Sequence, residues 1–213
     1  MIDWRSVNNL NQRILFFLIL IFPIFTYSFD GRFEKRKYGP YEILLFQDFR
    51  TGRGKIIIKK GKVKVFEESE IDNHYYFGNH FDPSSDELPD IFSGGDLTGD
   101  GIASLVISNW TGGAHCCHFL HVFELGKKLK KLVTVEALSS SIRLVDLDHD
   151  GYPEIEFWDG AIDEQFACFA GSPGGRVVLK FQNGRYEVAT HLMKKPMPTT
   201  KKIKHLKRDL VRA

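Results

Sequence analysis

Apolar and polar residues alternate over short stretches along most of this chain, and glycine or asparagine turns separate these stretches. Alternation with a period of two is typical of β-strands with one buried face, and helical periodicity is scarce here. The first of two hairpins turns near Lys60-Gly61, and the second turns on Asn183-Gly184, a strong signal for a two-residue loop. The pattern predicts strands at 41–46, 104–108, 117–124, 131–136, 142–145 and 154–158, hairpins over 54–66 and 176–189, and irregular segments at 67–92 and 159–175.

Short strands with frequent turns predict an all-β fold. The strand spacing fits one four-stranded unit every forty residues or so, roughly the length of one blade in a β-propeller. The residues after position 28 suffice for three to four such units, which is the lower limit for a closed propeller. We therefore expect a small or incomplete propeller-like stack of antiparallel sheets, with a two-sheet β-sandwich as the alternative.

The clearest chemistry lies in residues 146–154, Asp-Leu-Asp-His-Asp-Gly-Tyr-Pro-Glu. Acidic side chains occupy alternate positions, and another carboxylate follows shortly after the glycine, which allows a tight turn. Calcium takes roughly six to eight oxygen ligands, and carboxylates this dense repel one another without a cation. We predict a calcium site formed by the side chains of Asp146, Asp148, Asp150 and Glu154 and the backbone carbonyl of Tyr152.

This loop differs from an EF-hand. An EF-hand closes with a glutamate at its twelfth position and continues into a helix, but here that position is Phe157. The residues from Glu154 onward alternate like a strand. Glu154, at the ninth position, is therefore expected to close the site, and a β-strand is expected to leave it.

A related loop stands fifty positions earlier, at residues 96–104, Asp-Leu-Thr-Gly-Asp-Gly-Ile-Ala-Ser. Both loops begin with Asp-Leu, have Asp-Gly at the fifth and sixth positions and precede an apolar strand. The first loop has fewer anionic ligands, so its calcium affinity should be weaker. An ordinary Asp-Gly turn between strands is the alternative for either loop. The candidate ligands of the first loop are Asp96, Thr98, Asp100, Ile102 and Ser104.

Asp-Gly loops that lead into short apolar strands and repeat in this way resemble the FG-GAP or VCBS-type repeats of integrin-like β-propeller proteins. The resemblance covers residues 93–160, and it implies that the loops join strands of a blade and bind Ca²⁺. The carried-over ligands are Asp96, Asp100, Asp146, Asp148, Asp150 and Glu154, whereas Thr98 and Ser104 depart from the family pattern. The Ser-Gly-Gly at 93–95 and the run Thr-Gly-Gly-Ala-His-Cys-Cys at 111–117 are also similar to stretches of exported bacterial proteins, a similarity that implies no activity.

The N-terminus has the pattern of an export signal. Residues 1–13 are polar and contain Arg5 and Arg13, and residues 14–27 form an apolar run that is short for a bilayer-spanning helix. Small residues near Ser28 suit a cleavage site, so we expect a signal peptide at 1–28, a β domain at 29–193 and a basic tail at 194–213. An uncleaved N-terminal anchor is the alternative, and the expected location is periplasmic, secreted or at the cell surface.

Charge is unevenly distributed. Eight basic residues against Asp209 give the tail a charge of +7, so the rest of the chain, whose total is +2, carries −5. Such a tail can contact an anionic surface, but it has no interleaved aromatic residue, which argues against a nucleic-acid partner. The expected partner is a protein or glycan of the surface or envelope, and exposed sheet edges also allow self-association.

Cysteines and histidines gather at 115–121, His-Cys-Cys-His-Phe-Leu-His. In a strand, His118 and His121 face opposite sides, which weakens a zinc or copper site there. In an oxidising compartment a disulfide is favoured instead. Neighbouring Cys116 and Cys117 point apart, and we prefer Cys117–Cys168 slightly over Cys116–Cys168; a strained Cys116–Cys117 bridge is a further alternative.

Two functional hypotheses follow. The first is an exported calcium-binding β-repeat protein that acts as a binding or structural module without catalysis. The second is an exported metal- or thiol-dependent enzyme that uses the cluster from His115 to His121.

Overall fold

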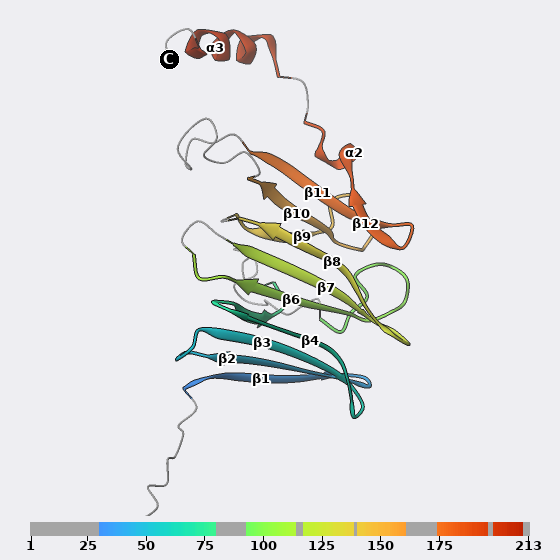
Figure 1. Cartoon of the computed structure of the whole chain (residues 1–213). Helices are drawn as coiled ribbons and strands as arrows, with labels where there is room; N and C mark the ends of the chain where they lie inside the picture. Colours follow the sequence, from blue (N-terminus) through green and yellow to red (C-terminus); the bar gives the residue numbers. More distant parts are fainter. Residues whose placement is uncertain are drawn as a thin grey trace, which may run out of the picture. The chain divides into compact units, whose positions relative to one another are not determined.

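The computed structural model describes residues 30–79, 93–113, 117–138, 140–160, 174–195 and 198–210. β-Strands dominate these residues and form three antiparallel sheets of four strands each (Figure 1). The predicted all-β stack of antiparallel sheets is confirmed, and three sheets replace the two of the alternative sandwich. The predicted signal segment 1–28 lies outside the described residues.

In each sheet the strands that are consecutive in the sequence are also neighbours in space, as in the meander of one propeller blade. Two helices follow the last strand, α2 (Thr190–Met193) and α3 (Thr200–Leu210). The first sheet contains β1 (Gly31–Tyr38), β2 (Tyr41–Asp48), β3 (Arg53–Lys60) and β4 (Val63–Ile71); the second contains β5 (His74–Phe77), β6 (Ser104–Trp110), β7 (His118–Leu125) and β8 (Leu129–Ala137); the third contains β9 (Ile142–Val145), β10 (Glu154–Asp159), β11 (Gly175–Gln182) and β12 (Arg185–Val188).

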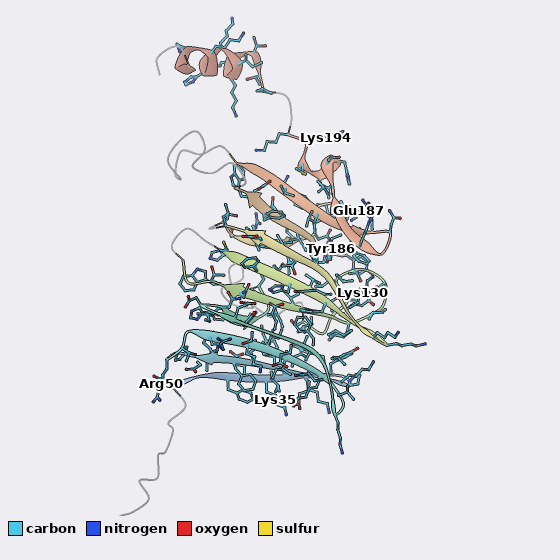
Figure 2. All side chains as sticks on the ribbon, in the orientation of Figure 1. Lys35, Arg50, Lys130, Tyr186, Glu187 and Lys194 are labelled. Carbon is cyan, nitrogen blue, oxygen red and sulfur yellow. The ribbon has the colours of Figure 1, made fainter. Side chains whose placement is uncertain are left out.

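The second sheet is buried on both faces. One face packs against the first sheet through a cluster that includes Ile43, Ile107 and Phe123. The other face packs against the third sheet through a cluster that includes Leu120 and Ile155. Burial on both faces explains why β6 contains three consecutive apolar residues, Leu105 to Ile107, and why its polar residues are buried too. Side chains fill the spaces between the sheets (Figure 2).

Polar contacts also join neighbouring sheets. The hydroxyl of Tyr41 in the first sheet donates to the carbonyl oxygen of Gly126 at 2.8 Å. The Asn79 side chain donates to the carbonyl oxygen of Ile142 at 2.6 Å, and the Lys130 ammonium donates to the carbonyl oxygen of Gly184 at 3.1 Å. These bonds join turns and strand ends of neighbouring sheets, so they limit how far one sheet can slide over the next.

Two strands were missed by the sequence analysis. Residues 31–38 form β1, although the stretch Gly-Arg-Phe-Glu-Lys-Arg-Lys-Tyr has few apolar positions. The prediction that 67–92 is irregular is wrong for its first part, because β4 extends to Ile71 and β5 covers 74–77. β1 and β4 are the edges of the first sheet, and edge strands tolerate charged residues, which hid β1 and the end of β4. β5 is the edge of the second sheet and has only four residues, too few to show a clear alternation.

The basic tail contains one helix, α3, whose lysines at 201, 202, 204 and 207 are exposed. Among the residues that the structure describes, no helix combines the length and the apolar character needed to cross a membrane.

Candidate metal and ion site

The second Asp-Gly loop joins adjacent antiparallel strands, as predicted. It connects β9 to β10, and the register pairs Val145 with Glu154 at its base. One oxygen from each of Asp146, Asp148 and Glu154 can lie within 4.8 Å of the others. Calcium binds oxygen ligands at about 2.3–2.6 Å, so oxygens on opposite sides of one ion are about 5 Å apart. The carboxylate spacing is therefore compatible with one metal ion of this size.

Backbone amides of this loop donate hydrogen bonds to its first aspartate, and the loop curves around that side chain. Asp146 accepts from the amides of Asp150 at 3.1 Å and Gly151 at 3.0 Å. Asp150 accepts from the Tyr152 amide at 2.9 Å, and Glu154 accepts from the Leu147 amide at 2.8 Å. Gly151 has a φ of 92°, which favours glycine. The loop geometry thus brings its carboxylates to one side.

The cation among these carboxylates is a lysine of the protein itself. Lys180 lies in β11 beside Glu154, because the register pairs Ile155 with Leu179. Its ammonium nitrogen lies 2.7 Å from Asp148 Oδ2, 2.6 Å from Asp150 Oδ2 and 2.8 Å from Glu154 Oε1. These distances place a positive charge where the sequence analysis expected calcium.

The electrostatics of this ion cluster are mutually reinforcing. Partial burial disfavours the charged amine, but hydrogen bonds to Asp148, Asp150 and Glu154 raise the pKa of Lys180 above its usual value. The bond from Lys180 in turn lowers the pKa of Asp150. Glu154 is only 1% exposed, so its charge needs a partner at close range. Lys180 supplies that partner.

The first loop has the same hydrogen-bonding plan. Asp96 accepts from the amides of Thr98 at 2.9 Å, Gly99 at 2.8 Å and Gly101 at 2.7 Å. Asp100 accepts from the Ile102 amide at 2.9 Å, just as Asp150 accepts from Tyr152. The two loops are therefore structural equivalents, as their sequences predicted.

The ninth position distinguishes the two loops. The hydroxyl of Ser104 accepts from the Leu97 amide at 3.3 Å, the role that Glu154 performs in the second loop. Across the next strand, Ser104 is paired with Glu124, whereas Glu154 lies beside Lys180. Within the described ranges, the second loop alone gathers three metal-ligating groups. Amide–carboxylate bonds hold the first loop, and calcium binding by Asp96, Thr98, Asp100, Ile102 and Ser104 stays a prediction.

The two loops lie against each other. Gly99 has a φ of 75°, and a Cβ atom added there would lie 2.9 Å from the Tyr152 ring. Tyr152, which the sequence analysis expected to supply only a carbonyl ligand, therefore also packs its ring on the first loop. A larger residue at position 99 would push the loops apart.

The histidine–cysteine segment does not assemble a metal site from its described residues. His118 and His121 lie on opposite faces of β7, as predicted: the His118 ring contacts the carbonyl oxygen of Ser140, and the His121 ring packs near Phe119 and Phe123. Cys117 is disulfide-bonded. His115, Cys116 and Cys168 lie outside the described residues, so the pairing of Cys117 with Cys168 stays a prediction.

Neither a protein-family model nor a curated protein nor a solved structure matches this chain. The resemblance to calcium-binding propeller repeats therefore rests on the two loops themselves. Lys180 is the site residue that sequence reasoning missed. Its signal in the sequence is a single lysine within the apolar run Val-Val-Leu-Lys-Phe of β11.

Asp96→Asn tests the hydrogen-bonded first loop. Partial burial disfavours the charged carboxylate, but the amides of Gly101, Thr98 and Gly99 outweigh it and lower the pKa of Asp96. The stabilisation is therefore present above the unfolded pKa and lost as the pH falls through the folded one. We expect the variant to lose about 1–3 kcal/mol of unfolding free energy at neutral pH, with a smaller difference near pH 3. Urea unfolding at neutral pH and near pH 3 measures the two differences. Asp100→Asn is the matched control, because Asp100 accepts a bond from one amide only. Equal effects of the two substitutions would contradict this account of the loop.

His121→Phe tests the buried histidine. Burial among the core side chains, with the positive charge of Lys131 nearby, lowers the pKa of His121 to about 4, and Glu68 acts in the opposite direction. The unfolded chain therefore binds a proton below pH 6.5 that the folded chain does not, and stability falls as the pH drops from 6.5 towards 4. We expect the wild type to lose about 2–3 kcal/mol more than the variant between pH 7 and pH 4. Parallel profiles of unfolding free energy against pH would contradict this assignment.

Proposed function

We propose that this chain is an exported calcium-binding β-repeat protein that acts as a binding or structural module without catalysis of its own. The observation that carries the proposal is the ion cluster of the second loop, in which Asp148, Asp150 and Glu154 bind one cationic group and Asp146 lies close to Asp148 and Glu154. The alternative of an enzyme based on the cluster from His115 to His121 has no support among the described residues, since His118 and His121 point in opposite directions.

Charge balance favours a divalent ion at this loop. Lys180 contributes one positive charge, and it bonds to Asp148, Asp150 and Glu154. An oxygen of Asp146 lies within 4.8 Å of oxygens of Asp148 and Glu154, so four carboxylates gather near a single ammonium group. A calcium ion in the same position would supply twice the positive charge. Calcium also accepts more oxygen ligands than the three hydrogen bonds that an ammonium group can donate.

Calcium and Lys180 would compete for the same oxygens. Calcium can enter only when the ammonium group withdraws, so part of the binding free energy is spent on breaking three charged hydrogen bonds. We therefore expect weak affinity, near the roughly 10⁻⁴–10⁻³ M range of extracellular calcium modules. A site of this strength responds to calcium outside the cell and stays ordered through Lys180 without it.

The stacked sheets suit a structural or binding role. The first and third sheets each pack against the second through one face. The exposed lysines of α3 would favour an anionic surface. Calcium at the second loop would hold the β9–β10 connection in place on the third sheet, where a protein or glycan partner can bind.

The substitution Lys180→Gln tests whether calcium can replace the lysine as the cation of the second loop. Without calcium, we expect the variant to lose about 3–5 kcal/mol of unfolding free energy, because Glu154 is left buried without a counter-charge. With millimolar calcium the variant should regain stability, and it should bind calcium at least tenfold more tightly than the wild type by titration calorimetry. Lys55→Gln is the matched control, since Lys55 forms an ion pair with Glu67 in the first sheet, which has no Asp-Gly loop.

Thermal unfolding in calcium and in excess EGTA completes this test. A bound ion raises the free energy of unfolding, and the increase grows as the ion concentration exceeds the dissociation constant. The thermal midpoint of the wild type should therefore rise in millimolar calcium. Absence of calcium binding in both the wild type and Lys180→Gln would overturn the calcium proposal. Binding of equal strength in both would place calcium elsewhere on the chain.

A further inference from the structure

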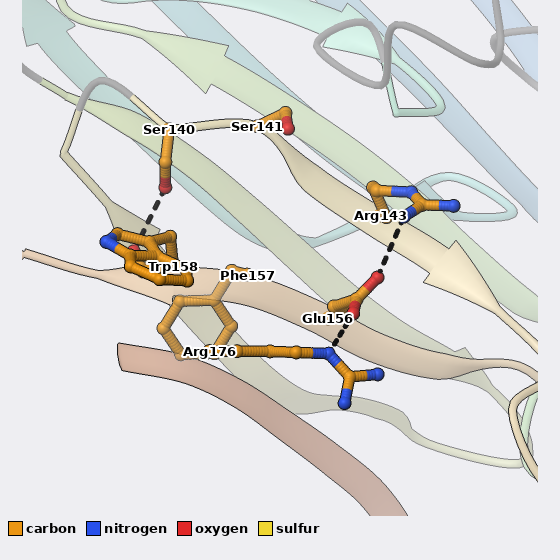
Figure 3. Close-up of a pocket in the computed structure, with 7 residues that line it drawn as sticks. All are labelled: Ser140, Ser141, Arg143, Glu156, Phe157, Trp158 and Arg176. Atoms are coloured by element: carbon orange, nitrogen blue, oxygen red, sulfur yellow. Dashed lines mark hydrogen bonds and ion pairs between the residues drawn. The ribbon is translucent and has the colours of Figure 1, made fainter. Parts of the chain in front are cut away.

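A small hollow lies on the face of the third sheet that carries Glu156 and Trp158, and none of its lining residues belongs to either Asp-Gly loop. It has a volume of about 180 Å³ and is lined by residues of β9, β10 and β11 and of the turn before β9 (Figure 3). Ligand pockets for drug-sized molecules typically measure about 300–1,000 Å³. This hollow is therefore suited to one small group, such as a single sugar ring at the end of a longer chain.

Two guanidinium groups converge on one carboxylate at the hollow. Arg143 Nη1 donates to Glu156 Oε2 at 3.1 Å, and Arg176 Nε donates to Glu156 Oε1 (Figure 3). Arg176 Nη1 also donates to the carbonyl oxygen of Leu192 at 2.9 Å, which ties this arginine to α2. One carboxylate faces two guanidinium groups, so the cluster keeps a net positive charge. Each guanidinium has five N–H donors, and these bonds use only some of them.

An exposed indole ring forms the other side of the hollow. Trp158 is 43% exposed, so part of its ring can contact a ligand. A Cβ atom added at Gly174 would lie 1.8 Å from the Trp158 indole nitrogen, so glycine at this position lets the ring lie directly against the backbone. The hydroxyl of Ser140 donates to the Trp158 carbonyl oxygen at 3.0 Å and holds the turn beside the ring (Figure 3). The aromatic surface is thus fixed in place before any ligand binds.

We propose that this hollow binds an acidic sugar: a ring that packs its C–H face on Trp158 and carries a carboxylate that Arg143 and Arg176 bind. Guanidinium forks match carboxylates in geometry and charge, and Glu156 holds both forks in position. The Lys195 ammonium lies 6.0 Å from the centre of the Trp158 ring and adds to the positive potential. Ser140 and Ser141 place hydroxyl groups beside the hollow, where sugar hydroxyls can exchange hydrogen bonds with them.

The position of the hollow favours a saccharide over a peptide. Peptides that add to a sheet bind along an unpaired edge through their backbone, whereas this hollow lies across the faces of three adjacent strands. Its aromatic, cationic and hydroxyl groups match the three kinds of surface that an acidic sugar presents. The inference rests on the proposed binding role of the chain and names the ligand class, but it does not require calcium.

The test measures binding of tetragalacturonate, an oligomer of acidic sugars, to the full chain by titration calorimetry and tryptophan fluorescence. We expect binding that weakens with salt, and none to the neutral oligomer maltotetraose. Trp158→Ala and Arg143→Gln should each reduce the affinity at least tenfold. Arg185→Gln is the matched control, because Arg185 is an exposed arginine of the same sheet that pairs with Glu187 away from the hollow.

Three outcomes would overturn the inference: no binding of tetragalacturonate at millimolar concentration, equal binding to Trp158→Ala, or equal binding of an acidic peptide of the same charge. Thermal unfolding of each variant shows whether it is folded. Arg143→Gln replaces an exposed side chain and should not disturb folding, so this variant still tests the inference if Trp158→Ala unfolds. Calcium titration of the same variants keeps the two proposals separate. Loss of sugar binding with unchanged calcium binding confirms independent sites, and failure of sugar binding leaves the calcium proposal standing.

Discussion

The carboxylate of Glu154 sets the main electrostatic constraint on this fold. It is almost completely buried at the start of β10, and Asp148 and Asp150 lie within hydrogen-bonding reach of the same ammonium group. Like charges this close raise the free energy of the folded state unless a cation lies between them. Lys180 meets that requirement from the neighbouring strand, so the ion cluster joins the β9–β10 loop to β11. The loop is consequently ordered by the protein alone, and the calcium ion that we propose would compete with Lys180 for a position that is already filled.

The comparison of the two loops shows how the protein varies one design. Both use an aspartate at the first position to accept backbone amides, and both use the ninth residue to accept the amide of the second. Where the ninth residue is Glu154, a lysine lies beside it; where it is Ser104, the cross-strand neighbour is Glu124. The acidic ninth residue therefore has a basic cross-strand neighbour, and the neutral ninth residue has an acidic one. The Tyr152 ring of the second loop packs on Gly99 of the first loop, so the two loops are in contact.

Local sequence signals predicted what depends on local geometry. The turn at Asn183-Gly184 was predicted because both residues adopt positive φ values readily, and they do so here, at 53° and 79°. The equivalence of the two loops followed from residue spacing within nine positions. Lys180 could not be predicted in this way, because its place beside Glu154 depends on the register of two strands separated by a long connection. Strand β1 was missed because an edge strand needs no continuous apolar face, and the pocket residues Arg143, Glu156 and Arg176 meet only when three strands are paired.

The most direct test of the central claim is to observe the Lys180 ammonium group by ¹⁵N NMR, in calcium-free protein, with Lys180→Gln used to assign its signal. If Lys180 is the resident cation of the second loop, its N–H protons will exchange slowly with water and will show couplings to the carboxylates of Asp148, Asp150 and Glu154. Added calcium will then abolish this signature as the ammonium group moves into solvent. A Lys180 signal that exchanges as fast as those of the exposed lysines of α3 would contradict the account.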